Sequence, residues 1–322
     1  MLINSIKFSN PHITNSKRKK HLHNINQIQI HTRYSARSFG SRVGEIEGRS
    51  LITKKALKRT DNSKSVQYAQ ITETLNEFLN EDKQSDSPLI KCVKPDFISR
   101  FSKEISNNPN KNILIGISGE SASGKSTICK TIDSLSQKLN MPIELISADN
   151  YFNDISALIA KYGSFDKLLE TGYDVDSPNN FYMDKLHDDL EELSNGKDVK
   201  IPQYLVNGTG ISVPNAIDKK AQKIIVVEGM ATMYSPVREL LDAQIFVDVA
   251  PEVQEKRYIE RAKRERNQTE EDALKQLYYV RDAAKKYILP KKDNSDIIID
   301  GNVQKENFKE VISRLYELFN DM

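Results

Sequence analysis

The chain has 322 residues and a formal net charge of +2. Hydrophobic residues make up 38% of it and charged residues 29%, which is ordinary for a soluble protein. No apolar run in the sequence is long enough to span a bilayer, and the two cysteines, Cys92 and Cys129, argue against a disulfide framework. We therefore expect a cytoplasmic protein without a membrane span, built as one large domain plus an appendage or as two domains.

The N-terminal segment, residues 1–64, differs from the rest of the chain. It is rich in Asn, Ser, Lys, Arg and His, and we predict that it is mostly disordered. Residues 1–44 carry eight Lys/Arg and no acid, which leaves about −6 for the remainder because the whole chain carries +2. The basic charge thus belongs to the tail, and we expect no nucleic-acid binding by the folded part. The same composition also fits a transit peptide to an organelle matrix.

Residues 65–110 are expected to form a helical extension. Apolar residues recur at helical spacing between Val66 and Leu79, which predicts an amphipathic helix over residues 66–80. A polar linker follows at residues 81–88, and a second short helix begins at Phe97. These helices could pack on the domain that follows or on a partner, and we favour packing on the domain.

From Asn112 onward, apolar strand-like runs alternate with helical segments, and the domain is assigned to residues 111–322. The strand-like runs lack polar alternation, as expected for strands buried on both faces. This alternation predicts an α/β domain with a doubly wound, mostly parallel sheet. The predicted strands are residues 113–117, 143–146, 224–227, 245–247 and 297–299, and the predicted helices are residues 126–139, 181–193, 252–266, 270–288 and 308–319.

The segment at residues 119–126 has the spacing G-x-x-x-x-G-K-[ST] between a predicted strand and a predicted helix. Its glycines allow consecutive N–H groups to point at phosphate oxygens, and the helix that follows adds the positive end of its dipole. Lys125 would reach the β- and γ-phosphates of ATP, the Ser126 hydroxyl would bind Mg²⁺, and Thr127 would lie near the α-phosphate. The predicted nucleotide-binding residues are Gly119, Glu120, Ser121, Ala122, Ser123, Gly124, Lys125, Ser126 and Thr127.

Two acids follow predicted strands: Asp149 after residues 143–146, and Glu228 after residues 224–227. In an open parallel sheet, ligands bind beyond the carboxyl ends of the strands. Phosphoryl transfer to an alcohol needs one carboxylate to accept the hydroxyl proton and an acid to hold Mg²⁺. Asp149 suits the first role, and Glu228 suits the second or a shared one. A single acid after a strand is often only a helix cap, but two acids in a chain with a phosphate loop favour the functional interpretation.

The predicted helix at residues 252–266 is strongly basic. Arg261 and Arg264 are three residues apart and share a face. A basic helix of this kind can close over a transferring phosphoryl group. The alternative, a solvated helix whose arginines pair with neighbouring glutamates, remains open on this pattern alone.

Seven motifs follow one another along the chain, at residues 116–127, 147–152, 173–178, 201–204, 227–229, 245–248 and 289–299. In this order and spacing they resemble the uridine kinase and phosphoribulokinase family of P-loop kinases over about residues 112–302. The resemblance implies a P-loop NTPase fold, ATP as the phosphate donor, and a small-molecule hydroxyl as the acceptor. It also implies that Asp149 activates the acceptor hydroxyl, that Glu228 lies near Mg²⁺, that Asp176 holds ribose hydroxyls, and that Tyr204 lies beside the acceptor pocket.

The same resemblance assigns Arg261 and Arg266 to a basic lid, although the family's usual Arg-Gly-Arg run is replaced here by residues 265–268. After Tyr204, family members usually continue with an Asp-Phe pair and then a histidine that touches the base. Here Leu205 holds the aspartate position and Thr209 the histidine position. A pyrimidine nucleoside is therefore the first expected acceptor, with a sugar phosphate or vitamin-precursor alcohol as an alternative. An ATP-binding regulatory switch without turnover is the third possibility.

Overall fold

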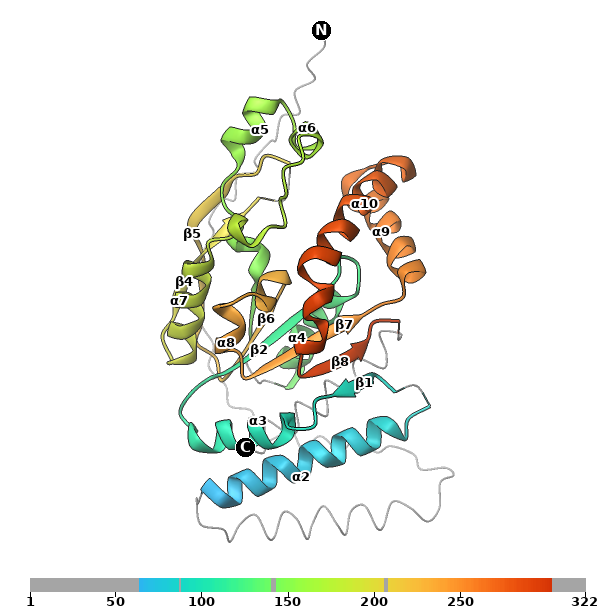
Figure 1. Ribbon diagram of the computed structural model, residues 1–322. Helices are drawn as coiled ribbons and strands as arrows, with labels where there is room; N and C mark the ends of the chain where they lie inside the picture. Colours follow the sequence, from blue (N-terminus) through green and yellow to red (C-terminus); the bar gives the residue numbers. More distant parts are fainter. Residues whose placement is uncertain (1–63, 87, 140–142, 206–207, 303–322) are drawn as a thin grey trace, which may run out of the picture. The chain divides into compact units, whose positions relative to one another are not determined.

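The computed structural model describes residues 64–302 except 87, 140–142 and 206–207 (Figure 1). All of the described residues belong to one structural unit, which comprises residues 60–322. The tail predicted at residues 1–64 lies almost entirely outside the described residues, and so does the helix predicted at residues 308–319. No helix within the described residues is long and apolar enough to cross a membrane.

A six-stranded sheet with the order β1-β8-β7-β2-β6-β3 lies at the centre of this unit (Figure 1). The central strand β2 pairs in parallel with β6 and β7, and β1 pairs with β8 in the antiparallel direction. The α/β class and the mostly parallel, doubly wound sheet predicted from the sequence are confirmed. The strands are β1 (Ile90–Val93), β2 (Ile113–Gly119), β3 (Ile143–Ser147), β6 (Ile224–Glu228), β7 (Ala243–Asp248) and β8 (Ile297–Asp300).

Helices connect these strands, and a separate antiparallel hairpin, formed by β4 and β5, follows helix α7. The hairpin and four short 3-10 helices were not predicted, nor were the short helices α5, α6 and α8. The helices are α2 (Lys64–Lys83), α3 (Phe97–Asn107), α4 (Lys125–Leu139), α5 (Ser156–Tyr162), α6 (Phe165–Glu170), α7 (Met183–Ser194), α8 (Val237–Leu240), α9 (Pro251–Arg266) and α10 (Glu270–Tyr287). The hairpin is β4 (Val199–Tyr204) and β5 (Ser212–Lys219), and the 3-10 helices are η1 (Ala148–Tyr151), η2 (Pro178–Asn180), η3 (Met230–Met233) and η4 (Leu289–Asn294).

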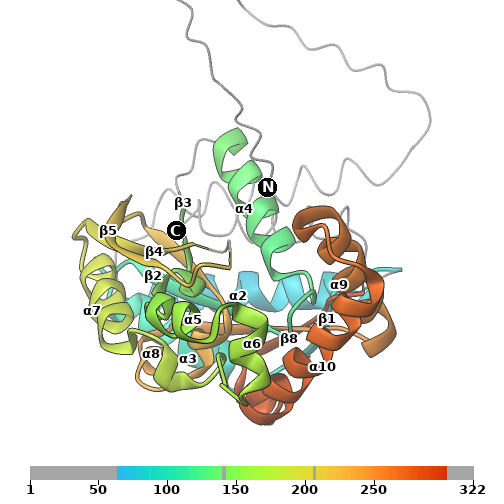
Figure 2. The ribbon, with the colours of Figure 1, turned by 90° about the horizontal axis from the view of Figure 1, so that it is seen from above.

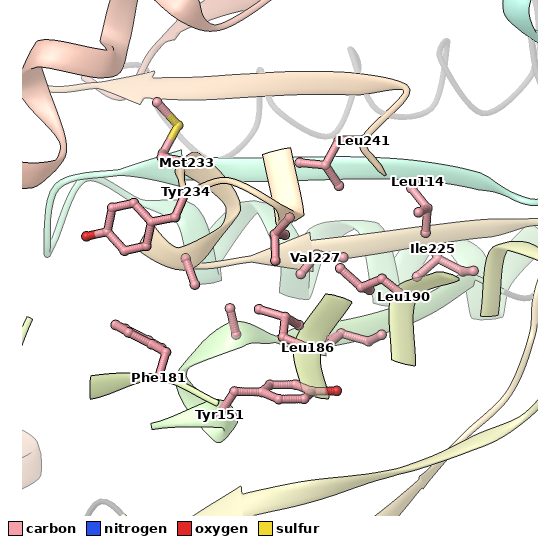
Figure 3. Packing of buried hydrophobic residues seen from close by; sticks show 14 of the residues in the cluster. Leu114, Tyr151, Phe181, Leu186, Leu190, Ile225, Val227, Met233, Tyr234 and Leu241 are labelled. Carbon is pink, nitrogen blue, oxygen red and sulfur yellow. The ribbon is translucent and has the colours of Figure 1, made fainter. Parts of the chain in front are cut away.

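The two faces of the sheet are buried under different helices. On one face, Leu114, Ile225 and Val227 pack with Leu186 and Leu190 of α7 (Figure 3). On the other face, β2, β6 and β7 pack against α4, the helix that follows the phosphate loop. Burial on both faces explains why these strands are apolar throughout rather than alternating. The packing also fixes the start of α4 relative to the end of β2.

The two helices expected before the α/β domain are present, and they pack on it as predicted. Ile71 and Leu75 of α2 join Phe97 and Phe101 of α3 in a cluster that also contains Ile113, the first residue of β2. The extension therefore covers the end of the sheet at which β2 begins. Between the two helices lies β1, which was not predicted.

Helices α9 and α10 lie on one side of the sheet, and the β4–β5 hairpin lies on the opposite side (Figures 1 and 2). The turn from α9 to α10 is specified locally. Asn267 ends α9 in the left-handed conformation, with a φ of 53°, which asparagine tolerates better than most residues. The Thr269 side chain then accepts a hydrogen bond from the backbone N–H of Asp272, so it caps the start of α10.

Candidate active site

The phosphate loop connects the end of β2 at Gly119 to the start of α4 at Lys125. Gly119 and Gly124 have φ values of 144° and 114°, a region that residues with a side chain rarely adopt. A Cβ atom on Gly119 would lie 2.5 Å from the Val247 carbonyl oxygen, so the close approach of β7 also requires glycine here. Ala122 has a φ of 62°, which is unusual for a non-glycine residue. The two glycines thus suit the conformation of the loop, whereas Ala122 is held in a conformation that it does not favour locally.

The ammonium group of Lys125 lies within the loop. Its Nζ donates hydrogen bonds to the carbonyl oxygens of Gly119 (2.8 Å) and Glu120 (2.9 Å). Burial lowers the pKa of Lys125, and the carboxylates of Glu228 and Asp149 oppose this effect. The Lys125 side chain therefore lies close both to the loop carbonyls and to the two acids that the sequence singles out.

Asp149 and Glu228 lie at the ends of neighbouring parallel strands. Ser147 and Glu228 are register partners of β3 and β6, and the Ser147 hydroxyl donates to Glu228 Oε1 (3.1 Å). Asp149 follows directly in η1. Burial, and next the charge of Glu228, raise the pKa of Asp149 to about 6, although Lys125 and Arg261 partly offset them. A carboxylate with such a pKa is deprotonated at neutral pH and can still accept a proton.

Gly229 allows these two acids to approach each other. Its φ is 133°, and a Cβ atom there would lie 2.9 Å from Ala148 Cβ and 3.4 Å from Asp149 Oδ1. Its backbone N–H also donates to the Ile117 carbonyl on β2 (3.0 Å). A larger residue would push η1 away from the end of β6, which would separate Asp149 from Glu228.

Asp176, in the loop that precedes η2, lines one cavity together with Asp149 and Glu228. Burial, and next the charge of Asp149, raise its pKa to about 6. Its backbone carbonyl accepts a hydrogen bond from Tyr234 Oη (3.4 Å). Phe152 also lines the cavity, and its ring centroid lies 4.1 Å from that of Phe181. Together, these residues give one end of the cavity two carboxylates and an aromatic surface.

A single cavity of about 780 Å³ joins the loop, the acids and one face of α9. Its volume lies in the range that is usual for small-molecule sites. Ser126 and Thr127 line it at the start of α4, as the motif predicts. Its lining residues also include Lys125, Asp149, Asp176, Glu228, Arg257, Arg261, Arg264 and Gly301.

Residues 114–307 match the model of the Phosphoribulokinase / Uridine kinase family. The chain belongs to this family. It is 34% identical over 194 residues to a uridine kinase of Vibrio campbellii, which covers 59% of this chain and 87% of that protein. It is also 34% identical over 193 residues to a uridine kinase of Staphylococcus epidermidis, with coverages of 59% and 88%. The chain is thus a small-molecule P-loop kinase that uses ATP to phosphorylate a hydroxyl group.

Solved structures of two other kinases are similar to this one at lower identity. The phosphoribulokinase of Rhodobacter spheroides aligns with a TM-score of 0.44 and 18% identity, over 62% of this chain and 74% of that chain. The D-glycerate 3-kinase of Cryptococcus neoformans aligns with a TM-score of 0.42 and 9% identity, over 74% and 96%.

Helix α9 brings some arginines of the kinase into the cavity and not others. Arg261 Nη2 donates to the Ser121 hydroxyl of the phosphate loop (2.9 Å), and Arg264 lines the cavity. Arg266, which the resemblance assigned to the lid, does not line it, since its Nη1 donates to Gln276 Oε1 (3.1 Å). Arg257, which was not predicted as a site residue, donates to the Ser123 carbonyl (3.3 Å). The spacing i, i+4, i+7 of the three cavity-lining arginines is the signal that would have found them.

Three further predicted residues lie at the edge of the cavity or behind it. Ser123 is fully buried beneath the loop, and Glu120 accepts a hydrogen bond from Gln254 Nε2 (3.3 Å). Tyr204 does not line the cavity either. Its ring lies 5.4 Å, centroid to centroid, from that of Phe152, which does line it. The cavity is lined here by Phe152, which was not among the predicted site residues.

The oxygen donors in the cavity suit magnesium. Within the described residues, no group of three or more His, Cys, Asp or Glu side chains forms a metal site of its own. Mg²⁺ in kinases is held instead by one or two carboxylates and hydroxyls together with the phosphates of the nucleotide. Ser126 and Glu228, which both line the cavity, provide a hydroxyl and a carboxylate of this kind. The donor set thus fits the metal that the sequence predicts.

Proposed function

We propose that this kinase transfers the γ-phosphate of ATP to the 5′-hydroxyl of a pyrimidine nucleoside, uridine or cytidine. The observation that carries the proposal is the presence of Asp149 and Asp176 in one cavity with Lys125. One carboxylate accepts the proton of the reacting hydroxyl, and the other binds the remaining hydroxyls of a sugar. A polyhydroxylated acceptor uses both carboxylates, whereas a simple alcohol leaves one of them without a partner.

On the donor side, the N–H groups of the phosphate loop bind the phosphates of ATP. Lys125 exchanges its two carbonyl partners for phosphate oxygens, and Arg261 adds positive charge from α9. Ser126 and Glu228 would hold Mg²⁺, which would supply positive charge beside the phosphates. These groups stabilise the charge that develops on the transferring phosphoryl group.

On the acceptor side, Asp149 accepts the proton of the 5′-hydroxyl while the oxygen of that hydroxyl bonds to the γ-phosphorus. The bond between that phosphorus and the β–γ bridging oxygen breaks, and ADP leaves. Asp176 accepts hydrogen bonds from ribose hydroxyls, which orients the nucleoside. Phe152 provides an apolar surface against which a ring can pack.

A different acceptor, a sugar phosphate or a vitamin-precursor alcohol, is the second candidate. Leu205, which follows β4, holds the position to which the resemblance to the family assigns an aspartate, and its backbone N–H donates to the Ile211 carbonyl (2.9 Å). A leucine cannot hydrogen-bond to a base, so this position does not select for a pyrimidine. Both candidates predict the same donor chemistry and differ only in the acceptor.

ATP consumption with a panel of acceptors tests the proposal. We expect turnover with uridine and cytidine, and less with sugar phosphates or pantothenate-like alcohols. Asp176→Asn should raise the KM for the nucleoside about tenfold with little change in the KM for ATP, because only the acceptor contact is weakened. Asp188→Asn, which changes an exposed carboxylate on α7, is the matched control. Turnover with sugar phosphates alone would favour the second candidate, and binding of ATP without any turnover would favour a regulatory switch.

A further inference from the structure

The segment that precedes the family match adds a strand to the sheet near the phosphate loop. β1 pairs with β8, which is followed by Gly301 and Asn302, and both of these residues line the cavity (Figure 1). Asp82, near the end of α2, is buried and accepts hydrogen bonds from the backbone N–H groups of Leu89 (3.0 Å) and Ile90 (2.9 Å). The start of β1 is therefore anchored both to α2 and to the sheet.

Lys91 of β1 lies between two carboxylates at the ends of β7 and β8. Asp248 and Asp300 are register partners in this parallel pair. Lys91 Nζ lies 3.0 Å from Asp248 Oδ2 and 3.4 Å from Asp300 Oδ1, and Lys292 Nζ lies 2.7 Å from Asp248 Oδ1. Burial tends to raise the pKa of Asp248, but hydrogen bonds from Lys292 and Lys91 outweigh it, so the pKa is lowered. Lys91 is thus the cation that contacts both neighbouring carboxylates.

The backbone that follows these strands touches the phosphate loop. The Gly301 N–H donates to the Asp248 carbonyl (2.6 Å). The Gly301 carbonyl accepts a hydrogen bond from Arg257 Nη1 (2.7 Å), which also donates to the Ser123 carbonyl of the loop (3.3 Å). A Cβ atom on Gly301 would lie 2.6 Å from the Ser123 oxygen. A shift at the end of β8 would therefore displace the phosphate loop.

Asp300 controls this turn through a second set of contacts. Its Oδ1 accepts hydrogen bonds from the backbone N–H (2.9 Å) and from the side-chain Nδ2 (2.8 Å) of Asn302. Lys292 pairs with Asp248, so loss of the Lys91 charge would leave Asp300 beside a second carboxylate without this counter-ion. Like charges on register partners repel each other, and the end of β8 is where that repulsion would act.

We propose that Lys91, a residue outside the family match, is a positioning residue for the bound nucleotide. It holds Asp300 beside Asp248 and thereby keeps Gly301 and Asn302 against the phosphate loop. The inference rests on the binding of ATP at this loop, which is part of the proposed function, and it does not depend on which acceptor is used. The N-terminal extension thus contributes to the site of a domain that it precedes in the chain.

Lys91→Met tests this inference, because it keeps the aliphatic stem and removes the charge. Calorimetric titration of the full-length protein with Mg·ATP should show a Kd about fivefold higher than in the wild type, since a partly exposed ion pair has a modest effect. The kcat and the KM for the acceptor should remain within about twofold of the wild type, and Lys91→Arg should restore ATP affinity. A purely structural role would instead lower the melting temperature and kcat without a selective effect on ATP.

Lys94→Met is the matched control, because the ammonium group of this neighbouring lysine donates to a backbone carbonyl, that of Asn294 (2.7 Å). Asp300→Asn added to Lys91→Met removes the repulsion while keeping Oδ1, so it should bring the Kd back to within about twofold of the wild type. Unchanged ATP affinity in Lys91→Met, or equal weakening in Lys94→Met, overturns the inference. If Lys91→Met does not fold, Lys91→Gln, which also removes the charge but keeps a polar side chain, carries the same test. A wild-type protein that does not bind ATP would refute the proposed function instead.

Discussion

The two ends of the cavity, to which we assign the phosphate donor and the acceptor, are built in different ways. At the donor end, the phosphate loop is defined by its backbone: the φ values of Gly119 and Gly124, the approach of Val247, and the carbonyl contacts of Lys125. At the acceptor end, the cavity is defined by the side chains of Asp149, Asp176 and Phe152. Phosphates are recognised by main-chain N–H groups in the same way in every P-loop protein, whereas acceptors are recognised by side chains that can be exchanged singly. The phosphate donor can therefore be predicted from one sequence motif, whereas the acceptor cannot.

The largest effect expected is at the donor end. Lys125→Ala removes the cation that contacts the loop carbonyls, and turnover should fall by about 10³-fold or more. Steady-state ATP consumption measures this loss, and Lys103→Ala, an exposed lysine on α3, is the control. Near-normal turnover in Lys125→Ala would mean that the loop does not act as the donor site.

Asp149→Asn separates the chemistry of the acceptor end from donor binding. We expect kcat to fall by about 10²- to 10³-fold with little change in ATP affinity, because the base is lost and the loop remains. In the wild type, kcat/KM should fall as the pH drops through about 6, since Asp149 is active only when deprotonated. Equal losses in kcat and in ATP affinity, or a flat profile down to pH 5, would contradict this role.

The same variant should make the protein without ligands more stable. The folded-state pKa of Asp149, about 6, lies above its ordinary value of 3.8. The folded protein therefore binds this proton more tightly than the unfolded chain does, and the carboxylate opposes folding above pH 6. Asn removes this cost, by up to about 3 kcal/mol at neutral pH. Thermal unfolding at pH 7 and at pH 5 measures the gain, which should be larger at pH 7.

Helix α9 offers an internal comparison with a smaller effect. Arg261→Gln should lower kcat about tenfold, because Arg261 contacts the loop, and Arg266→Gln should change it by less than about twofold. Measuring both variants under saturating substrates separates the two positions. An equal loss in Arg266→Gln would mean that α9 rotates or moves when substrates bind, so that the lid predicted from the resemblance forms only in the complex.

The smallest effect is expected at the residue after β4. Leu205→Asp introduces the side chain that the resemblance to the family assigns to this position, and it should improve the ratio of kcat/KM for uridine over other acceptors by a few-fold, about 1 kcal/mol. Leu205→Asn is the isosteric control without the charge. No change in this ratio would show that the acceptor is selected by Asp176 and Phe152 rather than by the hairpin.

Much of the fold could be predicted, because five of the six strands in the sheet are mainly apolar runs, and β2, β6 and β7 are buried along most of their length. The exceptions have physical reasons. β1 is four residues long and its burial is mixed, as expected for a strand at the edge of the sheet. β5 is exposed along most of its length, so its residues carry no hydrophobic pattern. Short or exposed strands are specified by their partners, which a single sequence does not identify.

The site was predictable where a motif fixes the backbone, and less so where the outcome depends on which way a side chain points. The positions of Gly119 to Thr127 follow from the motif, and the strand ends bring Asp149 and Glu228 together. Tyr204, which the resemblance assigns beside the acceptor, does not line the cavity, whereas Phe152, whose ring lies 5.4 Å from that of Tyr204, does. Arg266 lies half a helical turn away from the face of Arg257, Arg261 and Arg264, so the choice of arginine depended on the rotation of α9.

The placement of β1 has a consequence for how the kinase can be shortened. A protein trimmed to begin at Leu114, where the family match starts, would lack β1, which is the antiparallel partner of β8. The backbone N–H and C=O groups of Ile297, Ile298 and Ile299 would then line an open, apolar edge of the sheet. Such an edge pairs readily with a strand of another molecule, and the result is aggregation. By covering this edge of the sheet, β1 therefore also protects the kinase against self-association.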